Sequence, residues 1–238
     1  MFSISSRLKT LWAEALDYVF PKECLNCQKE GEYLCSACFA KIELFEQFPC
    51  FICNSGQYEV GICPECQEQT SIDQIVIACT YTNNIAGQLV EQFKYNYLEE
   101  LKKLLGQLLI KQIQKQGLNS VFYAQKLVPV PLHKIRLAER GFNQASELAK
   151  QLRVKYNCQL EQELVQRQEN TLHQAKLNRQ QRLQNLQNAF RINIRQVIPE
   201  QVILIDDVLT TGATFSEIAK TCKAAGIKKV VCSAVCHG

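Results

Sequence analysis

The rhythm of apolar and polar positions changes at about residue 75. From there to the C-terminus, short apolar runs alternate with longer stretches in which leucine, isoleucine and alanine recur at helical spacing. The short runs predict strands at 75–81, 126–130, 160–165, 202–205 and 228–235. The longer stretches predict a helix that starts at Asn83 or Asn84 and runs towards Tyr95, and helices over 98–116, 144–156 and 215–225. Strands separated by crossover helices indicate an α/β fold with a mainly parallel sheet covered on both faces.

The first 70 residues follow a different pattern. Residues 1–20 predict a short amphipathic helix, in which Lys9, Glu14 and Asp17 interrupt the apolar positions. These charges are atypical of a secretory signal, and the chain has no run of eighteen apolar residues, so we expect no membrane span and a cytoplasmic location. Residues 21–70 are rich in cysteine and lack sustained periodicity. We therefore expect three parts: a helix at 1–20, a zinc-binding module at 21–70 and an α/β domain at 71–238.

Eight of the 13 cysteines form four CxxC pairs. Two residues between cysteines let both thiolates of a turn face one ion, and two such pairs complete a tetrahedral shell. The pattern predicts one or two structural zinc ions held by Cys24, Cys27, Cys35, Cys38, Cys50, Cys53, Cys63 and Cys66. Pairing in chain order and interleaved pairing both fit the spacing, and an iron–sulfur cluster is the minor alternative. We expect the other five cysteines to pack in the core.

Positive charge is concentrated in the middle of the chain. Residues 126–195 hold 13 lysine and arginine residues against 5 acidic ones, a net charge of +8, whereas the whole chain carries +4. Such a stretch suits a polyanionic ligand, and a solvated helical surface is the alternative. The part at 166–188 is rich in Gln, Asn and Arg and has no clear apolar face. A loop of this length inside a domain is typically functional or disordered, and we interpret it as a candidate lid.

The string VILIDDVLTTGATFSE at 202–217 carries the most specific chemistry. An apolar strand ends in Asp206 and Asp207, and a turn of small hydroxyl residues then opens into a helix. The two carboxylates would accept hydrogen bonds from ribose hydroxyls, directly or beside Mg²⁺. We expect the turn to present hydroxyl and N–H donors to a phosphate, with the glycine permitting close backbone approach, from Thr210, Thr211, Gly212, Ala213 and Thr214. The alternative is an acidic strand end followed by ordinary threonine capping.

This string resembles the phosphoribosyl-pyrophosphate (PRPP) signature of type I phosphoribosyltransferases. The whole chain is similar to the ComF family, in which a phosphoribosyltransferase-like domain follows an amino-terminal zinc finger. The similarity also includes the CxxC pairs and Phe20-Pro21. The similarity also rests on the string LVPVPLHKIRLAERGFNQ at 127–144 and, within 170–190, on Gln174, Leu177, Arg182, Asn185 and Phe190.

The resemblance implies roles for further segments. Residues 130–134 would contact pyrophosphate, and 170–190 would form a mobile loop that closes over the site. Arg136 and Arg140 place fixed positive charge after the strand predicted at 126–130, where it suits phosphate oxygens, although a solvated surface arginine is a fair alternative for Arg136. His133 and His173 are interpreted as incidental rather than catalytic. The expected phosphate-binding residues here are Pro131, Leu132, Arg136 and Arg140.

Two kinds of function fit these features. One is a phosphoribosyltransferase that transfers the 5-phosphoribosyl group of Mg-bound PRPP to an acceptor, which no residue of the sequence identifies. The other, implied by the resemblance, is binding of single-stranded DNA during DNA uptake in natural transformation, with an ATP-dependent DNA translocase as partner. We expect a protein that binds PRPP or ribose 5-phosphate with its loop and single-stranded DNA with its basic surface. The alternative is a non-catalytic DNA-binding or PRPP-sensing protein.

Overall fold

A computed structural model describes residues 22–47, 49–56, 58, 61–82, 85–96, 99–168, 188–193, 195 and 197–238. The predicted helix at 1–20, the capping residues Asn83 and Asn84, and 169–187 with His173 lie outside these residues. In the described parts of the chain, no helix combines the length and apolarity needed to cross a bilayer.

The chain forms two compact units, Met1–Glu43 and Leu44–Gly238. Sequence patterning predicts one cysteine-rich module over 21–70, whereas the division falls inside that segment. The reason is packing: Cys50, Cys63 and Cys66 are buried in the same hydrophobic core as the strands of the larger unit. In the smaller unit, the short helix α2 (Ser36–Phe39) follows a turn closed by a bridge between Glu23 and Glu30.

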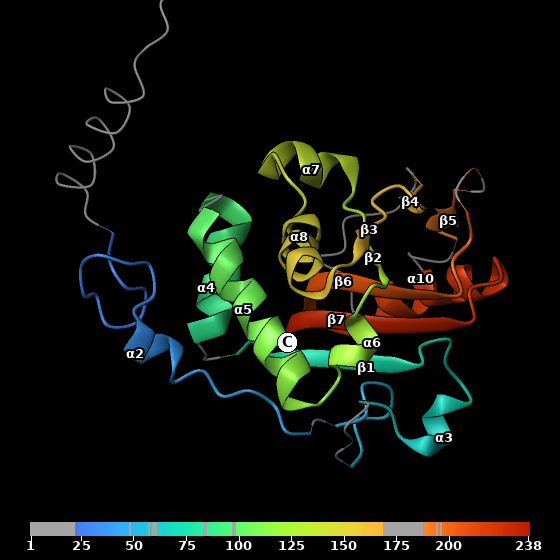
Figure 1. The fold of residues 1–238 in the computed structure, drawn as a ribbon, viewed down its shortest axis with the longest axis horizontal. Coiled ribbons are helices and arrows are strands. Elements are labelled where there is room, and N and C mark those ends of the chain that lie inside the picture. The colour runs from blue at the N-terminus through green and yellow to red at the C-terminus, as the bar shows by residue number, and fades with distance from the viewer. Residues whose placement is uncertain are drawn as a thin grey trace, which may run out of the picture. The chain divides into compact units, whose positions relative to one another are not determined.

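The larger unit is built on a five-stranded parallel sheet (Figure 1). Its strands are buried apolar runs, as expected of a sheet that is covered on both faces. This confirms the predicted α/β class. In spatial order the strands are β1 (Gln74–Thr80), β7 (Lys229–His237), β6 (Gln201–Leu209), β2 (Lys126–Pro129) and β3 (Gln159–Leu160).

The described helices of this unit, which connect and cover the strands, are α3 (Pro64–Gln67), α4 (Ile85–Asn96), α5 (Glu99–Lys115), α6 (Asn119–Phe122), α7 (Lys134–Arg140), α8 (Gln144–Tyr156) and α10 (Ala213–Ala224). A Cβ atom on Gly106 of α5 would lie 2.6 Å from Cβ of Gln151 in α8, so the glycine permits the close packing of these two helices. From the adjacent strands β2 and β6, the chain proceeds to neighbours on opposite sides, β3 and β7, so right-handed crossovers place α8 and α10 on opposite faces.

Most predicted elements are confirmed to within a few residues; the strands predicted at 160–165 and 202–205 differ, and α7 was not predicted. The single strand predicted at 160–165 is two short strands, because the charged and polar residues 161–163 form a turn whose Glu161 pairs with Lys126 at 2.6 Å. The second of these, β4 (Val165–Arg167), pairs antiparallel with β5 (Phe190–Ile192) and so joins the two ends of the predicted lid segment. Helix α7 is not predicted by periodicity, since it buries no residue.

Strand β6 is longer than predicted. The sequence predicts that it ends at Asp206 and Asp207, but its pairing with β7 continues to Leu209 opposite His237. The two carboxylates therefore lie within a sheet strand rather than at its end. The five cysteines predicted to pack in the core are all buried: Cys79, Cys158, Cys222, Cys232 and Cys236.

Candidate functional site

The candidate site lies where β2 and β6 separate. Their pairing ends at Pro129 and Ile205, after which the Val130 N–H donates to the Ile205 carbonyl at 2.9 Å. Beyond this point β6 continues towards Leu209, whereas the chain after β2 leaves the sheet into α7. Because the crossovers from β2 and β6 lie on opposite faces, this is a topological switch point, the place where open α/β sheets bind ligands at the carboxyl ends of their strands.

Asp206 and Asp207 stand at this switch point. Asp206 is half-buried, and its Oδ1 accepts a hydrogen bond from the Asp207 N–H at 2.9 Å. Asp207 is 9% exposed, and its buried Oδ2 accepts no hydrogen bond from any described residue. Burial and, next, the Asp207 carboxylate raise the pKa of Asp206 well above its ordinary value. Within the described chain neither aspartate forms a salt bridge.

The residues after β6, which the sequence predicts to bind an anion, form a turn that leads into α10. Gly212 has a left-handed backbone (φ 71°) and is the N-cap of α10, a conformation that favours glycine. The Thr211 hydroxyl oxygen accepts from the Ala213 N–H at 3.4 Å, while Thr210 is exposed and Thr214 is half-buried. The first turn of a 12-residue helix thus opens directly from the strand that carries the two aspartates.

Helix α7 follows the other strand of the switch point. His133 caps it, with Nδ1 accepting from the Ile135 N–H at 3.3 Å, so this histidine has a structural role at the helix start. Arg136 is half-buried, and Arg140 donates to the Gln144 side chain at 2.9 Å. Gly141, with φ 74°, ends the helix. The predicted phosphate-binding residues Pro131, Leu132, Arg136 and Arg140 therefore lie on one connection, between β2 and α8.

Arg167 is a further candidate site residue, which the sequence analysis did not select. Burial, followed by the neighbouring charge of Arg136, lowers the pKa of Arg167, while Asp206 acts in the opposite direction. Strand β4 thus brings Arg167 within electrostatic range of two predicted site residues. A cavity of about 280 Å³ lies beside it, lined by Leu132, His133, Lys134, Ile135, Arg167 and Gln168. The available signal was an arginine near the start of the polar stretch at 166–188.

A second group of charges lies at the end of β1 and on α4. The Tyr81 hydroxyl donates to Glu91, and Lys94 pairs with the same carboxylate at 3.2 Å and lies 5.3 Å from the centre of the Tyr81 ring. Burial and then Glu91 raise the pKa of Tyr81. Lys94 counteracts the raised pKa of Asp206, so α4 also contributes charge to the site. Periodicity alone gave no reason to select these residues.

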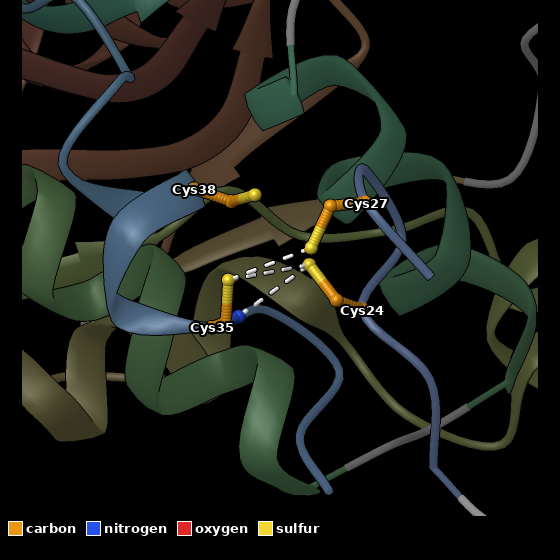
Figure 2. A group of neighbouring side chains, drawn as sticks. All are labelled: Cys24, Cys27, Cys35 and Cys38. Carbon is orange, nitrogen blue, oxygen red and sulfur yellow. Dashed lines mark hydrogen bonds between the residues drawn. The ribbon is translucent and has the colours of Figure 1, made fainter. Parts of the chain in front are cut away.

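The eight CxxC cysteines form two groups, one in each unit. Cys24, Cys27, Cys35 and Cys38 converge in the smaller unit (Figure 2), and Cys50, Cys53, Cys63 and Cys66 converge in the larger. Within each group the sulfur atoms all lie within 4.8 Å of one another. This resolves the alternatives left open by the spacing: the pairs combine in chain order, not interleaved.

The sulfur geometry fits tetrahedral zinc. Metal–sulfur bonds of about 2.3 Å give a tetrahedron with edges of about 3.8 Å. The Sγ–Sγ distances are 3.8 Å for Cys24–Cys35, 3.7 Å for Cys27–Cys35 and 3.7 Å for Cys53–Cys63. A hydrogen bond with Ser55 lowers the pKa of Cys53 to about 6, which favours the ligating thiolate. Each group can therefore hold one zinc ion.

Comparison with known proteins connects this arrangement to a family. No family model matches the chain. The chain is 31% identical to Competence protein F of Haemophilus influenzae over 89% of its own length and 95% of that protein. It is 28% identical to DNA utilization protein YhgH of Escherichia coli over 79% of its length and 89% of that protein. Competence protein ComFC of Streptococcus pneumoniae is also 28% identical, with 87% and 88% covered.

These similarities cover most of the chain, at the identity and coverage expected of homologues. They agree with the resemblance expected from the 127–144 and 202–217 strings. The chain belongs to the ComF family.

Proposed function

We propose that the switch point between β2 and β6 binds PRPP, or ribose 5-phosphate, together with Mg²⁺. The observation that carries the proposal is the turn at Gly212. Its left-handed backbone turns a buried strand directly into the start of α10, where helical N–H groups and the positive end of the helix dipole meet. The 5-phosphate would bind to this turn, which comprises Thr210, Thr211, Gly212, Ala213 and Thr214.

The two aspartates would bind the ribose. Carboxylate oxygens accept hydrogen bonds from vicinal hydroxyls and are also suitable ligands for Mg²⁺. The buried Asp207 Oδ2, which accepts no hydrogen bond from the described residues, is suited to such a partner. In this proposal the cost of holding two carboxylates close together is offset when the ligand binds.

The pyrophosphate would lie towards α7. Pro131 and Leu132 lead into this helix. Arg136 is within electrostatic range of the half-buried Arg167, so both guanidinium groups would contribute positive charge to the pyrophosphate region. Arg140 lies one turn further along α7. In a transferase, departure of pyrophosphate would leave an oxocarbenium-like anomeric carbon, and these cations would stabilise the leaving group. The stretch at 166–188 is the proposed lid, and the pairing of β4 with β5 brings together the described residues at its two ends.

The cellular role that we propose is DNA uptake. The names of the relatives, Competence protein F and DNA utilization protein YhgH, support it. The +8 stretch at 126–195 would bind single-stranded DNA through phosphate contacts, in the cytoplasm and alongside an ATP-dependent DNA translocase. The cysteine groups would hold two structural zinc ions. A zinc-binding part at 21–70 would then precede a phosphoribosyltransferase-like domain at 71–238.

Titration calorimetry with Mg-PRPP tests the binding proposal. The wild type is expected to bind, and Asp206→Asn and Asp207→Asn are expected to abolish binding. Glu200→Gln is the matched control, because it removes one negative charge at the opposite end of β6, where Glu200 is exposed and pairs with Lys228 at 2.8 Å. Equal affinity of all four proteins for PRPP would refute the assignment. Pyrophosphate release on addition of candidate acceptors separates a transferase from a binding protein.

Binding of single-stranded DNA is tested by its salt dependence. Each phosphate contact removed lowers the slope of log affinity against log salt by about 0.7 for single strands. Arg136→Gln and Arg140→Gln should each lower the slope by about this amount, while Asp206→Asn should leave it unchanged. A slope near zero for the wild type would contradict the DNA-binding proposal.

A further inference from the structure

The two cysteine groups differ in what surrounds them. Among the described residues of the smaller unit, 22–43, the apolar side chains buried with the cysteines are Leu34 and Ile42. In the larger unit, three of the four cysteines are part of the main hydrophobic core, which also contains Leu209, Ala213 and Phe215 from the end of β6 and the start of α10. The second group is therefore packed against the segment that forms the candidate anion-binding turn.

Phe51 makes the direct connection between them. It lies between Cys50 and Cys53, and it packs against the same core. A Cβ atom added to Gly212 would lie 2.7 Å from Cδ2 and 2.8 Å from Cε2 of the Phe51 ring. The ring thus lies against the α-carbon of Gly212, and no larger residue fits there without displacing the ring. Glycine at 212 meets two requirements, the left-handed backbone and this contact.

The position of Phe51 is set by the cysteine turn. The Phe51 N–H donates to the Gly61 carbonyl at 3.2 Å, the Asn54 N–H donates to the Cys50 carbonyl at 2.7 Å, and the Cys50 N–H donates to the Ser55 carbonyl at 3.1 Å. These bonds shape the loop that presents Cys50 and Cys53 to an ion. An ion that holds both sulfur atoms therefore also holds the backbone from which Phe51 projects.

We propose that Phe51 is a positioning residue that makes the conformation of the anion-binding turn depend on the metal in the second cysteine group. With Cys50, Cys53, Cys63 and Cys66 ligating an ion, the Phe51 ring supports Gly212 and fixes the start of α10. Loss of that ion releases the ring and loosens the turn. The first cysteine group, which is in the other compact unit, has no such effect. The consequence for ligand affinity rests on the proposed binding of PRPP, whereas the consequence for the turn does not.

The test measures the turn itself, by amide hydrogen exchange of peptides covering 209–216 in the zinc-loaded, full-length protein. We expect Phe51→Ala and Cys53→Ser to accelerate exchange there about tenfold or more, and Phe51→Leu to have a smaller effect. Two controls are matched to these variants. Ile52→Ala truncates the neighbouring side chain, which also packs on the core, and Cys27→Ser removes the equivalent exposed cysteine of the first group. Both should leave exchange at 209–216 unchanged.

The outcomes separate this inference from the proposed function. Unchanged exchange in Phe51→Ala and Cys53→Ser, or equal acceleration in Cys27→Ser or Ile52→Ala, overturns the coupling whether or not PRPP binds. If the wild type binds Mg-PRPP, Phe51→Ala should weaken its affinity about tenfold or more, as misplaced binding groups do. If the wild type does not bind PRPP, the proposed function fails while the exchange result still decides the coupling.

A double-mutant cycle gives a second measurement in case the Cys53 variant folds poorly. Gly212→Ala places a methyl group against the Phe51 ring, so it should destabilise the wild type more than it destabilises Phe51→Ala. Additive effects on the urea midpoint in the two backgrounds would show that the ring and Gly212 are not coupled, and would overturn the proposal.

Discussion

Replacing Asp206 by asparagine should stabilise the ligand-free protein at neutral pH. The asparagine side chain would keep an oxygen to accept from the Asp207 N–H, so the shape and this hydrogen bond are preserved. What is removed is a negative charge that burial and the neighbouring Asp207 disfavour, partly offset by the attraction of Lys94. Arg167 loses an attractive partner too, but burial and the Asp207 charge are the larger effects. The negative charge that is proposed to bind the ligand therefore destabilises the ligand-free protein.

The pH dependence follows from the direction of the pKa. An acid with a pKa raised by folding binds more protons in the native than in the unfolded state, so the free energy of unfolding falls as pH rises between the two values. This loss amounts to about 1.4 kcal/mol per pH unit and stops above the native pKa. The asparagine variant does not undergo this loss of unfolding free energy, because its side chain does not ionise. Its advantage should therefore be small near pH 4 to 5 and grow to on the order of 1–3 kcal/mol by pH 8.

Urea unfolding of both proteins between pH 5 and 8.5, in saturating zinc, measures this difference. The pH dependence of the cysteine ligands is shared by the two proteins and cancels in the comparison. Addition of Mg-PRPP at about 100 times its dissociation constant should then add about 2.7 kcal/mol to the wild type alone. An advantage that does not change with pH, or a variant less stable than the wild type at pH 8, would refute the electrostatic argument.

Three further predictions concern metal and packing. Cys27→Ser and Cys53→Ser should each lower the zinc content, measured by metal analysis, from two ions to one, because each cysteine belongs to a different group of four; a variant that retains two ions contradicts the assignment of its group. Phe215→Ala, which truncates a fully buried side chain of α10, should lower the free energy of unfolding by about 3–5 kcal/mol in urea; a loss below about 1 kcal/mol would mean that this core is not close-packed. Lys102→Met should lower the free energy of unfolding by about 1–3 kcal/mol, because the Glu147 side chain, which is 8% exposed, would keep only Lys150 as an ionic partner among the described residues. Lys150→Met removes the more exposed partner and should lower the free energy of unfolding by less.

Local patterns were sufficient to predict the sheet and the turn. The apolar run before Asp206 favours a buried strand, and the glycine at 212 permits a left-handed turn. Both conformations depend on local residues, so both could be predicted from the sequence. The CxxC spacing likewise reports a local turn. It could not report which pairs combine, because that depends on how the chain between them folds.

The features that sequence missed depend on contacts between distant residues. Arg167 reaches the site because β4 pairs with β5, a contact across the predicted lid segment. Helix α7 buries no side chain, so it leaves no apolar periodicity to detect. The extension of β6 to Leu209 depends on pairing with β7, whose residues come last in the chain. The contact between Phe51 and Gly212 joins residues that are far apart in sequence, and neither residue type is unusual in its local setting.

The separate locations of the two cysteine groups also determine when each can mature as the protein is synthesised. The four thiols near the amino terminus can bind their ion as soon as residues 22–43 have left the ribosome, since their unit is complete by then. Cys50, Cys63 and Cys66 instead join a core that includes Val202, Phe215 and Val230. Until the last part of the chain emerges, these thiols lack the hydrophobic surroundings that bury them in the finished protein. A limited zinc supply during translation should therefore affect the two groups unequally, with the later one the more vulnerable to oxidation.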